Sequence, residues 1–263
     1  MKKREGICHI CGEHKVLTYE HVPPRAALNN AKARVYSGVD IVQQQQNKIS
    51  PDTTGLRYQD LQRGTGGYTL CAECNNNTGA FYAPHYNEFV TMMYELLQDE
   101  YPEWRNHKTP AGGPYTTINV VSKPINGLAI FKQMIAMFCS TFRSDGYQYE
   151  FRDFLLNKNS TDFDRERWGV SIYINTGLRC GSSGLSTFFS TDGETFDFAE
   201  IITIPIGIVL YDRKSAIMKN TRIDPHFFGC NITGFSQQPY DTLLNFGLEL
   251  PLNYGARFMP GFK

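Results

Sequence analysis

The sequence lacks any long apolar segment. Its longest apolar run, Ile201 to Leu210, is too short to cross a lipid bilayer and contains a proline and a glycine. The first residues are basic, but no apolar run follows them, so we do not expect a signal peptide. We therefore expect a soluble, cytoplasmic protein without a membrane partner.

The chain also has no net charge, because 26 lysines and arginines balance 26 aspartates and glutamates. The balance is uneven along the sequence. Residues 1–80 have 10 basic and 7 acidic side chains, whereas the remaining residues have 16 and 19. A small positive excess in the first part is compatible with contact to a phosphate backbone, but it does not identify a nucleic-acid-binding protein by itself. No internal repeat and no nucleotide-binding loop is visible.

Cysteines are the informative residues that are present. Four of the seven form two Cys-x-x-Cys pairs, Cys8 with Cys11 and Cys71 with Cys74. Two such pairs can supply four thiolates to one tetrahedral zinc ion, and Gly12 fits the tight turn of a zinc knuckle. We predict one shared structural zinc. The alternatives are two independent redox dithiols, unligated cysteines, or His9 or His14 in place of a thiolate.

Polar side chains suited to metal-dependent hydrolysis stand beside both cysteine pairs. Glu20-His21 ends a predicted strand, Val16 to Tyr19, and Asn75 directly follows the second pair. If zinc joins the two pairs, the end of this strand and the start of the next helix become neighbours. A carboxylate, an imidazole and a carboxamide would then converge. These groups can bind a hard divalent cation and provide a general base.

The order of motifs over residues 8–80 resembles the HNH endonucleases of the ββα-metal superfamily. The motifs are Cys-x-x-Cys, then Glu-His-Val-Pro-Pro, then Leu-Cys-x-x-Cys-Asn-x-x-Thr-Gly. The chain is similar to bacterial members that have an "EHVPP" variant and zinc knuckles on both sides. Proteins of this kind are commonly restriction, mobile-element or antiphage-defence nucleases.

The resemblance implies a role for each candidate residue. His21 would be the base that deprotonates the attacking water. Glu20, in place of the family's usual aspartate, and Asn75 would bind a catalytic Mg²⁺ or Mn²⁺ ion, and Arg25 would contact phosphate. The substrate would be DNA, with RNA less expected. The alternative function is a non-catalytic zinc-knuckle module that binds nucleic acid or another partner.

The sequence departs from the family pattern at the middle asparagine, which helps to orient the catalytic histidine. The corresponding residues 64–70 (GTGGYTL) contain no asparagine. A backbone carbonyl, Thr65 or Thr69 is therefore expected to orient the His21 imidazole.

Hydrophobic patterns elsewhere predict an α+β fold with an antiparallel sheet. Residues 27–64 are polar and read as a long loop or insertion, with one short helix at most. Apolar positions at helical spacing predict two helices, His85 to Gln98 and Gly127 to Phe142, with Cys139 in the core face of the second. The predicted strands are Tyr68 to Leu70, Thr116 to Val121, Val170 to Ile174, Leu185 to Ser190, Phe196 to Ala199 and Ile201 to Tyr211.

We divide the chain near residue 82. Residues 1–82 form the predicted zinc-stapled ββα-metal (HNH) module. Residues 83–263 form an α+β domain for target binding, homo-oligomerisation or partner-protein contact, or regulation. Asn75 to Asn77 and Thr78 are typical helix-capping residues, so a helix is predicted to begin near them. Asp192-Gly193 predicts a hairpin turn between two strands.

Overall fold

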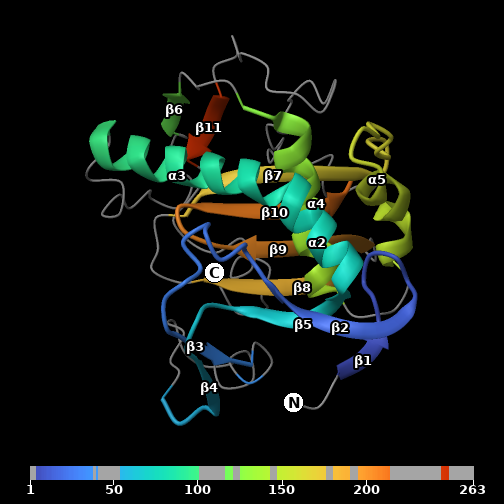
Figure 1. Cartoon of the computed structure of the whole chain (residues 1–263). Coiled ribbons are helices and arrows are strands. Elements are labelled where there is room, and N and C mark those ends of the chain that lie inside the picture. The colour runs from blue at the N-terminus through green and yellow to red at the C-terminus, as the bar shows by residue number, and fades with distance from the viewer. Residues whose placement is uncertain are drawn as a thin grey trace.

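The structure is a computed structural model of the chain. It describes residues 4–37, 40, 54–100, 116–120, 125–142, 147–175, 180–189, 195–213 and 244–248. Its elements (Figure 1) are, in chain order, β1 (Arg4–Ile7), β2 (His14–His21), β3 (Ala33–Tyr36), β4 (Tyr58–Leu61), β5 (Gly66–Cys71), α2 (Ala72–Phe81), α3 (Ala83–Glu100), β6 (Thr116–Val120), α4 (Gly127–Thr141), the 3₁₀ helix η1 (Tyr147–Phe151), α5 (Arg152–Leu156), β7 (Trp168–Ile174), β8 (Gly181–Phe189), β9 (Thr195–Ile202), β10 (Ile206–Asp212) and β11 (Leu244–Leu248). None of the helices in these ranges has both the length and the apolar character that crossing a bilayer requires.

Three antiparallel strands, in the order β1-β2-β5, form the N-terminal sheet. β2 pairs with β5 from Leu17 opposite Cys71 to His21 opposite Gly66, and α2 follows β5 at once. The two strands predicted near the cysteine pairs are confirmed, and both are longer than predicted. The chain therefore builds a strand–strand–helix unit whose hairpin has a cysteine end and a His21 end.

The helix after β5 begins earlier than the capping residues predicted. Cys71, in extended conformation, is the residue before α2, and it makes no side-chain capping hydrogen bond. Asn75 and Thr78 lie inside the helix, where the Thr78 hydroxyl donates to the Asn75 carbonyl at 3.1 Å. The early start has a physical reason, because residues three apart at a helix start share one side. Cys71 and Cys74 can therefore face the same partner.

The polar stretch between the hairpin strands is not only a loop. β3 and β4 pair antiparallel, with Arg34 opposite Asp60 and Tyr36 opposite Tyr58, and form a separate two-stranded ribbon. The prediction of a loop or insertion missed these strands because their residues do not alternate clearly between apolar and polar. The glutamine run at residues 43–46 lies outside the described residues.

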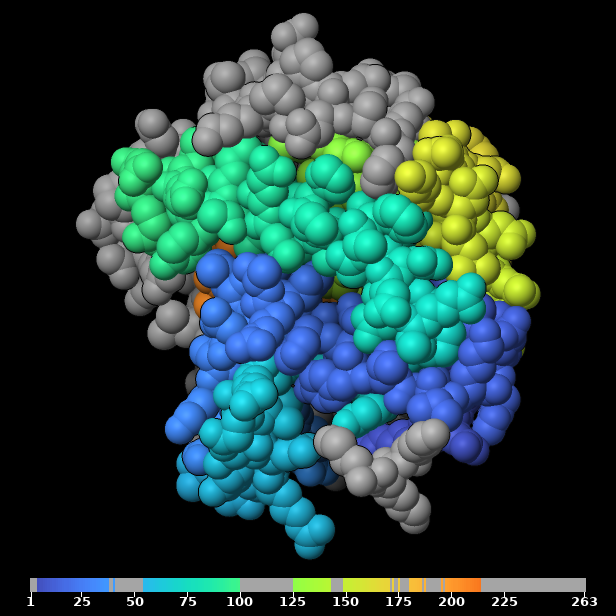
Figure 2. Space-filling view, viewed as in Figure 1, coloured from blue at the N-terminus to red at the C-terminus, as the bar shows by residue number. Residues whose placement is uncertain are grey.

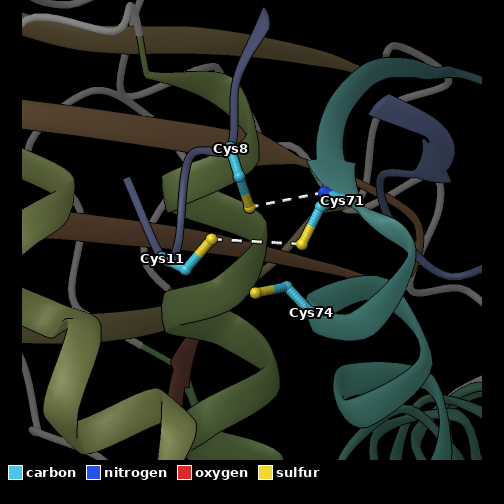
Figure 3. A group of neighbouring side chains, drawn as sticks. All are labelled: Cys8, Cys11, Cys71 and Cys74. Carbon is cyan, nitrogen blue, oxygen red and sulfur yellow. Dashed lines mark hydrogen bonds between the residues drawn. The ribbon is translucent and has the colours of Figure 1, made fainter. Parts of the chain in front are cut away.

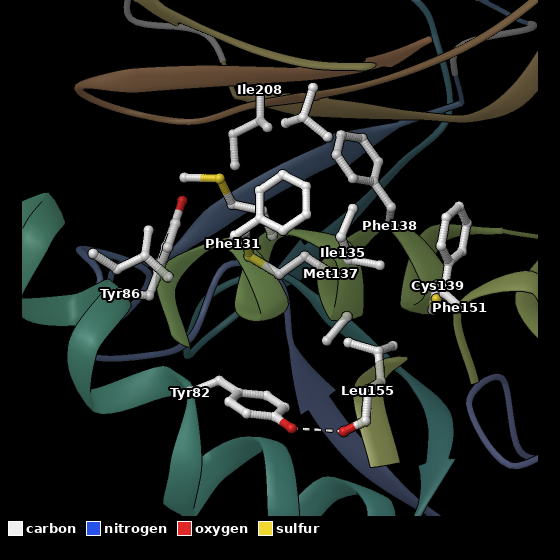
Figure 4. Close-up of a cluster of buried hydrophobic side chains, with 14 of the residues drawn as sticks. Tyr82, Tyr86, Phe131, Ile135, Met137, Phe138, Cys139, Phe151, Leu155 and Ile208 are labelled. Carbon is white, nitrogen blue, oxygen red and sulfur yellow. Dashed lines mark hydrogen bonds between the residues drawn. The ribbon is translucent and has the colours of Figure 1, made fainter. Parts of the chain in front are cut away.

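A four-stranded antiparallel sheet, in the order β7-β10-β9-β8, forms the centre of the second part. α4 packs between this sheet and the helices α2 and α3, and 14 of its 15 residues are buried. Figure 4 shows Phe131 and Phe138 of α4 on the side of Ile208, while Tyr82 and Leu155 lie on the other side of this helix. A helix that is apolar on nearly all sides belongs in a core. The predictions of this helix and of the antiparallel sheet are confirmed.

The prediction of one strand over Ile201 to Tyr211 is wrong. β9 ends at Ile202 and β10 begins at Ile206, and the two pair antiparallel with Gly207 opposite Ile202. Pro205 between them has no backbone N–H to donate to a sheet, so the apolar run folds back on itself. The Asp192-Gly193 turn lies outside the described residues, although β8 and β9 do pair on either side of it.

The buried side chains form one hydrophobic cluster that contains residues from both predicted parts. It includes Leu70 of β5, Phe89 of α3, Met134 of α4 and Leu210 of β10. Tyr82, at the predicted boundary, is 1% exposed, and its hydroxyl donates to the Leu155 carbonyl at 2.6 Å. The fold is thus a mixed α+β fold with antiparallel sheets. The division near residue 82 stays a prediction.

Candidate metal centre and active site

Four buried cysteines meet at one end of the β2–β5 hairpin. Cys8 and Cys11 come from the turn between β1 and β2, whereas Cys71 ends β5 and Cys74 lies in the first turn of α2 (Figure 3). Their four sulfur atoms all lie within 4.8 Å of one another. Zn–S bonds of about 2.3 Å in tetrahedral geometry place the sulfurs about 3.8 Å apart. The cluster therefore has the ligand type, number and spacing of a structural zinc site.

The local backbone supports these sulfur positions. The Cys71 N–H donates to Cys8 Sγ at 3.3 Å, and the Gly12 N–H donates to the Cys8 carbonyl at 2.9 Å. Gly12 has φ +75°, and an added Cβ would lie 2.3 Å from the Tyr149 ring. Only glycine fits this turn comfortably, as the sequence predicts for a zinc knuckle.

The thiols perturb one another strongly. A hydrogen bond from Cys74 lowers the pKa of Cys8 to about 4, and the Cys71 backbone contributes. The same bond raises the pKa of Cys74, while burial raises that of Cys11. Four neighbouring thiolates in a buried site need a cation among them, since like charges oppose ionisation. The cluster can hold a metal ion such as zinc, which in a closed four-cysteine site is structural.

The other candidate ligands lie elsewhere. His9 Nδ1 is 3.0 Å from the Cys139 carbonyl, so this ring connects the first knuckle to α4. Cys139 is fully buried, as predicted, and Cys180 is exposed. The two Cys-x-x-Cys pairs lie together in one cluster. Two independent redox dithiols would not require the pairs to be adjacent, so the arrangement favours a shared metal site.

At the opposite end of β2, the Asn75 side chain connects α2 to the strand. Its Nδ2 donates to Thr18 Oγ1 at 2.9 Å and to the Tyr19 carbonyl at 3.2 Å. The helix start therefore lies next to the strand end, as expected if the cysteines join the two knuckles. Both bonds use the amide nitrogen. The Asn75 oxygen, by which an asparagine binds metal, forms no hydrogen bond within the described ranges.

Glu20 and His21 leave β2 on opposite sides. Side chains alternate along a strand, so Glu20 shares the α2 side with Thr18, and His21 shares the other side with Tyr19. The Tyr19 and His21 rings form an edge-to-face pair with centroids 5.0 Å apart. Burial raises the pKa of the Glu20 carboxyl to about 7. Glu20 is thus a desolvated carboxylate whose charged form a cation would stabilise.

The imidazole of His21 is half-buried beside Thr65 and Arg25. Burial lowers its pKa, the Thr65 backbone opposes that shift, and the positive charge of Arg25 lowers the pKa further. Nδ1 is buried and has no hydrogen bond of ordinary geometry to any described residue. A lowered pKa keeps the ring neutral near pH 7, which is the form that accepts a proton.

Sequence reasoning missed Asn29, which holds the chain on both sides of His21. Its buried side-chain amide donates to the Pro23 carbonyl at 2.6 Å and to the Thr65 carbonyl at 2.8 Å, and its Oδ1 accepts from the Thr65 N–H at 2.7 Å. The Val22 N–H in turn donates to the Thr65 carbonyl at 3.1 Å. Of the two threonines named from the sequence, Thr65 therefore lies beside His21.

Gly64 is the sequence feature that could have indicated the contact between Asn29 and the chain at Thr65. It has φ +89°, and an added Cβ would lie 2.0 Å from the Asn29 carbonyl oxygen. Thr69, the other threonine, lies where the β2–β5 register shifts, and its hydroxyl is buried without a partner among the described residues. Arg25 is exposed beside this end of the hairpin.

Comparisons of the chain with models of protein families, with curated proteins and with solved structures give no match.

Proposed function

We propose that this protein is a metal-dependent endonuclease of the HNH type that hydrolyses phosphodiester bonds in DNA. One observation carries the proposal. A single strand, β2, begins beside a four-cysteine cluster and ends at Glu20-His21, where Asn75 of the following helix reaches it through the Tyr19 carbonyl.

Glu20 and His21 lie on opposite sides of the strand end, an arrangement compatible with in-line nucleophilic displacement at a phosphorus atom. In-line attack places the water and the leaving oxygen on opposite sides of the phosphorus atom. Because Glu20 and His21 leave the strand on opposite sides, a phosphate at the end of β2 would have the imidazole on one side and the carboxylate on the other. Neutral His21 then accepts the proton of the attacking water.

Glu20 and Asn75 offer the oxygen donors that a hard divalent cation prefers, a carboxylate and a carboxamide. A bound Mg²⁺ or Mn²⁺ ion would stabilise the negative charge on the leaving 3′ oxygen. Arg25 contributes a positive charge close to His21 for contact with the phosphate. Asn29 and Thr65 keep the chain around the imidazole in place.

The test compares the two histidines of β2. Purified protein should nick supercoiled plasmid DNA with Mg²⁺ or Mn²⁺, and His21→Ala should reduce the rate by about 10²- to 10⁴-fold, the usual contribution of a general base. His14→Ala, at the exposed start of the same strand, is the matched control and should cleave normally. Zinc content and thermal unfolding should be the same in all three proteins.

Two results would overturn the proposal. One is a wild-type protein that binds DNA but does not nick it with either metal, which would favour the non-catalytic binding module. The other is a His21→Ala protein that cleaves as fast as the wild type. Cleavage of RNA in preference to DNA would keep the mechanism and change the substrate.

A further inference from the structure

The positive excess of the N-terminal part lies entirely in the segment inserted between β2 and β5. Residues 22–65 have six basic and three acidic side chains. The rest of the first 80 residues has four of each. The β2–β5 hairpin and its helix are thus close to neutral, and the insertion is the basic element.

The described part of this insertion contains the β3–β4 ribbon. It extends from the hairpin where His21 pairs with Gly66, and Figure 2 shows it (blue and light blue) as a lobe at the lower left of the molecule. The two segments at its base are joined, since the Gly64 N–H donates to the Ala31 carbonyl at 2.9 Å, and the base is tied to the His21 end, since the Val22 N–H donates to the Thr65 carbonyl at 3.1 Å. Asn29 and Thr65 tie the same base. The ribbon is therefore fixed relative to the candidate active site.

The surface of the ribbon is open, and exposed basic side chains flank its two strands. Tyr58 is 54% exposed and Val35 is 38% exposed, so neither face of the ribbon is fully covered. Arg34 is engaged, since it pairs with Asp60 at 2.9 Å and stacks on Tyr58. Four other exposed basic side chains have no carboxylate within 4.0 Å among the residues that the structure describes: Arg25, Lys32, Arg57 and Arg63.

We propose that the β3–β4 ribbon is a DNA-binding arm that enters the major groove of duplex DNA and holds the phosphate backbone at the His21 end of the hairpin. This inference rests on the proposed nuclease function and specifies its substrate. Unpaired basic side chains that flank an open ribbon, such as Lys32, Arg57 and Arg63, complement a phosphate backbone. The insertion that contains the arm begins at the residue after His21, so a backbone bound to the base of the arm passes the candidate catalytic histidine.

The shape of the arm favours DNA over RNA. The major groove of B-form DNA is about 12 Å wide and admits a two-stranded β-ribbon. The major groove of A-form RNA is deep and narrow, and side chains do not reach its bases. The arm therefore selects a DNA duplex, in agreement with the proposed substrate of the nuclease.

The experiment measures binding without cleavage. Fluorescence anisotropy of a labelled 30-base-pair DNA duplex, about three helical turns, is recorded over a salt series in the His21→Ala background. Adding Arg57→Ala and Arg63→Ala should weaken binding at least about 10-fold near 0.15 M salt, and should reduce the slope of log K against log salt by about 2. Lys158→Ala with Arg165→Ala, two exposed basic residues outside the arm, is the matched control and should change neither value.

Further variants separate charge from folding. Arg57→Lys with Arg63→Lys keeps the charge and should restore the wild-type salt slope. An arm variant with the affinity and slope of its parent would overturn the proposal. Equal binding of an RNA duplex of the same sequence, with the same loss in the arm variant, would overturn the groove assignment.

The same measurements separate this inference from the nuclease proposal. A wild-type protein that never nicks plasmid, but whose DNA binding depends on Arg57 and Arg63, would defeat the nuclease and keep the arm. A protein that nicks plasmid through His21, but binds DNA equally well without these arginines, would keep the nuclease and defeat the arm.

Discussion

The two ends of β2 differ in almost every physical property. At the start of the strand, four buried cysteines face one another within 4.8 Å, and backbone N–H groups donate to their sulfur and carbonyl atoms. At its end, Glu20 and His21 are only partly buried, and His21 Nδ1 has no hydrogen-bond partner in the described part of the chain. The cysteine end is therefore buried and internally bonded, whereas the His21 end has polar groups that hydrogen bonds among the described residues do not satisfy.

The difference between the two ends shows how one short hairpin can hold unsatisfied polar groups at one end by means of stabilising contacts elsewhere. A desolvated carboxylate and an unsatisfied imidazole each cost free energy, so they persist only where other contacts hold the chain. The cysteine cluster and the Asn29–Thr65 hydrogen bonds are such contacts. We therefore expect substitutions at the cysteine end to affect folding, and those at the His21 end to affect chemistry.

Loss of one cysteine should have the largest effect. Cys71→Ser removes a ligand from a site whose metal affinity and folding are one free energy, on the order of 10 kcal/mol. We expect the protein to lose its bound zinc and its N-terminal unit to unfold, as measured by metal analysis and circular dichroism. Cys180→Ser, an exposed cysteine outside the cluster, should keep both properties. Retention of zinc and stability by Cys71→Ser would refute a structural four-cysteine site.

Removal of the Asn29 side chain should have an intermediate effect. Asn29→Ala leaves the Pro23 carbonyl and the Thr65 N–H without their partner, and we expect a loss of about 3 kcal/mol in the free energy of unfolding. Chemical denaturation measures this loss. The exposed neighbour Asn30 is the control, and Asn30→Ala should cost less than about 0.5 kcal/mol. Equal stability of both variants would mean that the His21 end needs no internal support.

Neutralising Glu20 should have a smaller, pH-dependent effect. Burial raises the folded-state pKa of Glu20 to about 7, above its unfolded value, so the folded state binds more protons between about pH 4.5 and 7. Stability from this group is present below that range and is lost as the pH rises through it. Without added divalent cation, Glu20→Gln should therefore be more stable than the wild type by about 2 kcal/mol at pH 8, and equal to it near pH 4.

Thermal and denaturant unfolding across this pH range measure the difference. Glu13, near the cysteine end, is the contrasting control because Lys15 lowers its pKa, so Glu13→Gln should bring no gain at high pH. Added Mg²⁺ should stabilise the wild type at pH 8 and leave Glu20→Gln unchanged. A wild-type protein that Mg²⁺ does not stabilise would remove Glu20 from the metal site.

Much of the fold could be predicted from local pattern. The apolar positions of residues 127–142 predict the central helix because few other structures bury so many neighbouring side chains. The run from Ile201 to Tyr211 breaks into two strands. Pro205 was the sequence signal for this break, but a pattern based on apolar residues does not detect a turn that is itself apolar. β3 and β4 escaped prediction because the stability of a ribbon depends on cross-strand pairs such as Arg34 with Asp60, which lie far apart in sequence.

For the candidate site, the sequence by itself determined the cysteine spacing and the order of Glu20, His21 and Asn75. Cysteine chemistry makes that spacing informative, because few arrangements of four thiols are stable inside a protein without a shared cation. Only the tertiary structure decided that Glu20 and His21 face opposite sides of one strand end, that Asn29 supports the histidine, and that the insertion forms a ribbon flanked by basic residues. These facts depend on strand pairing and on hydrogen bonds between residues such as Asn29 and Thr65, which a linear pattern does not contain.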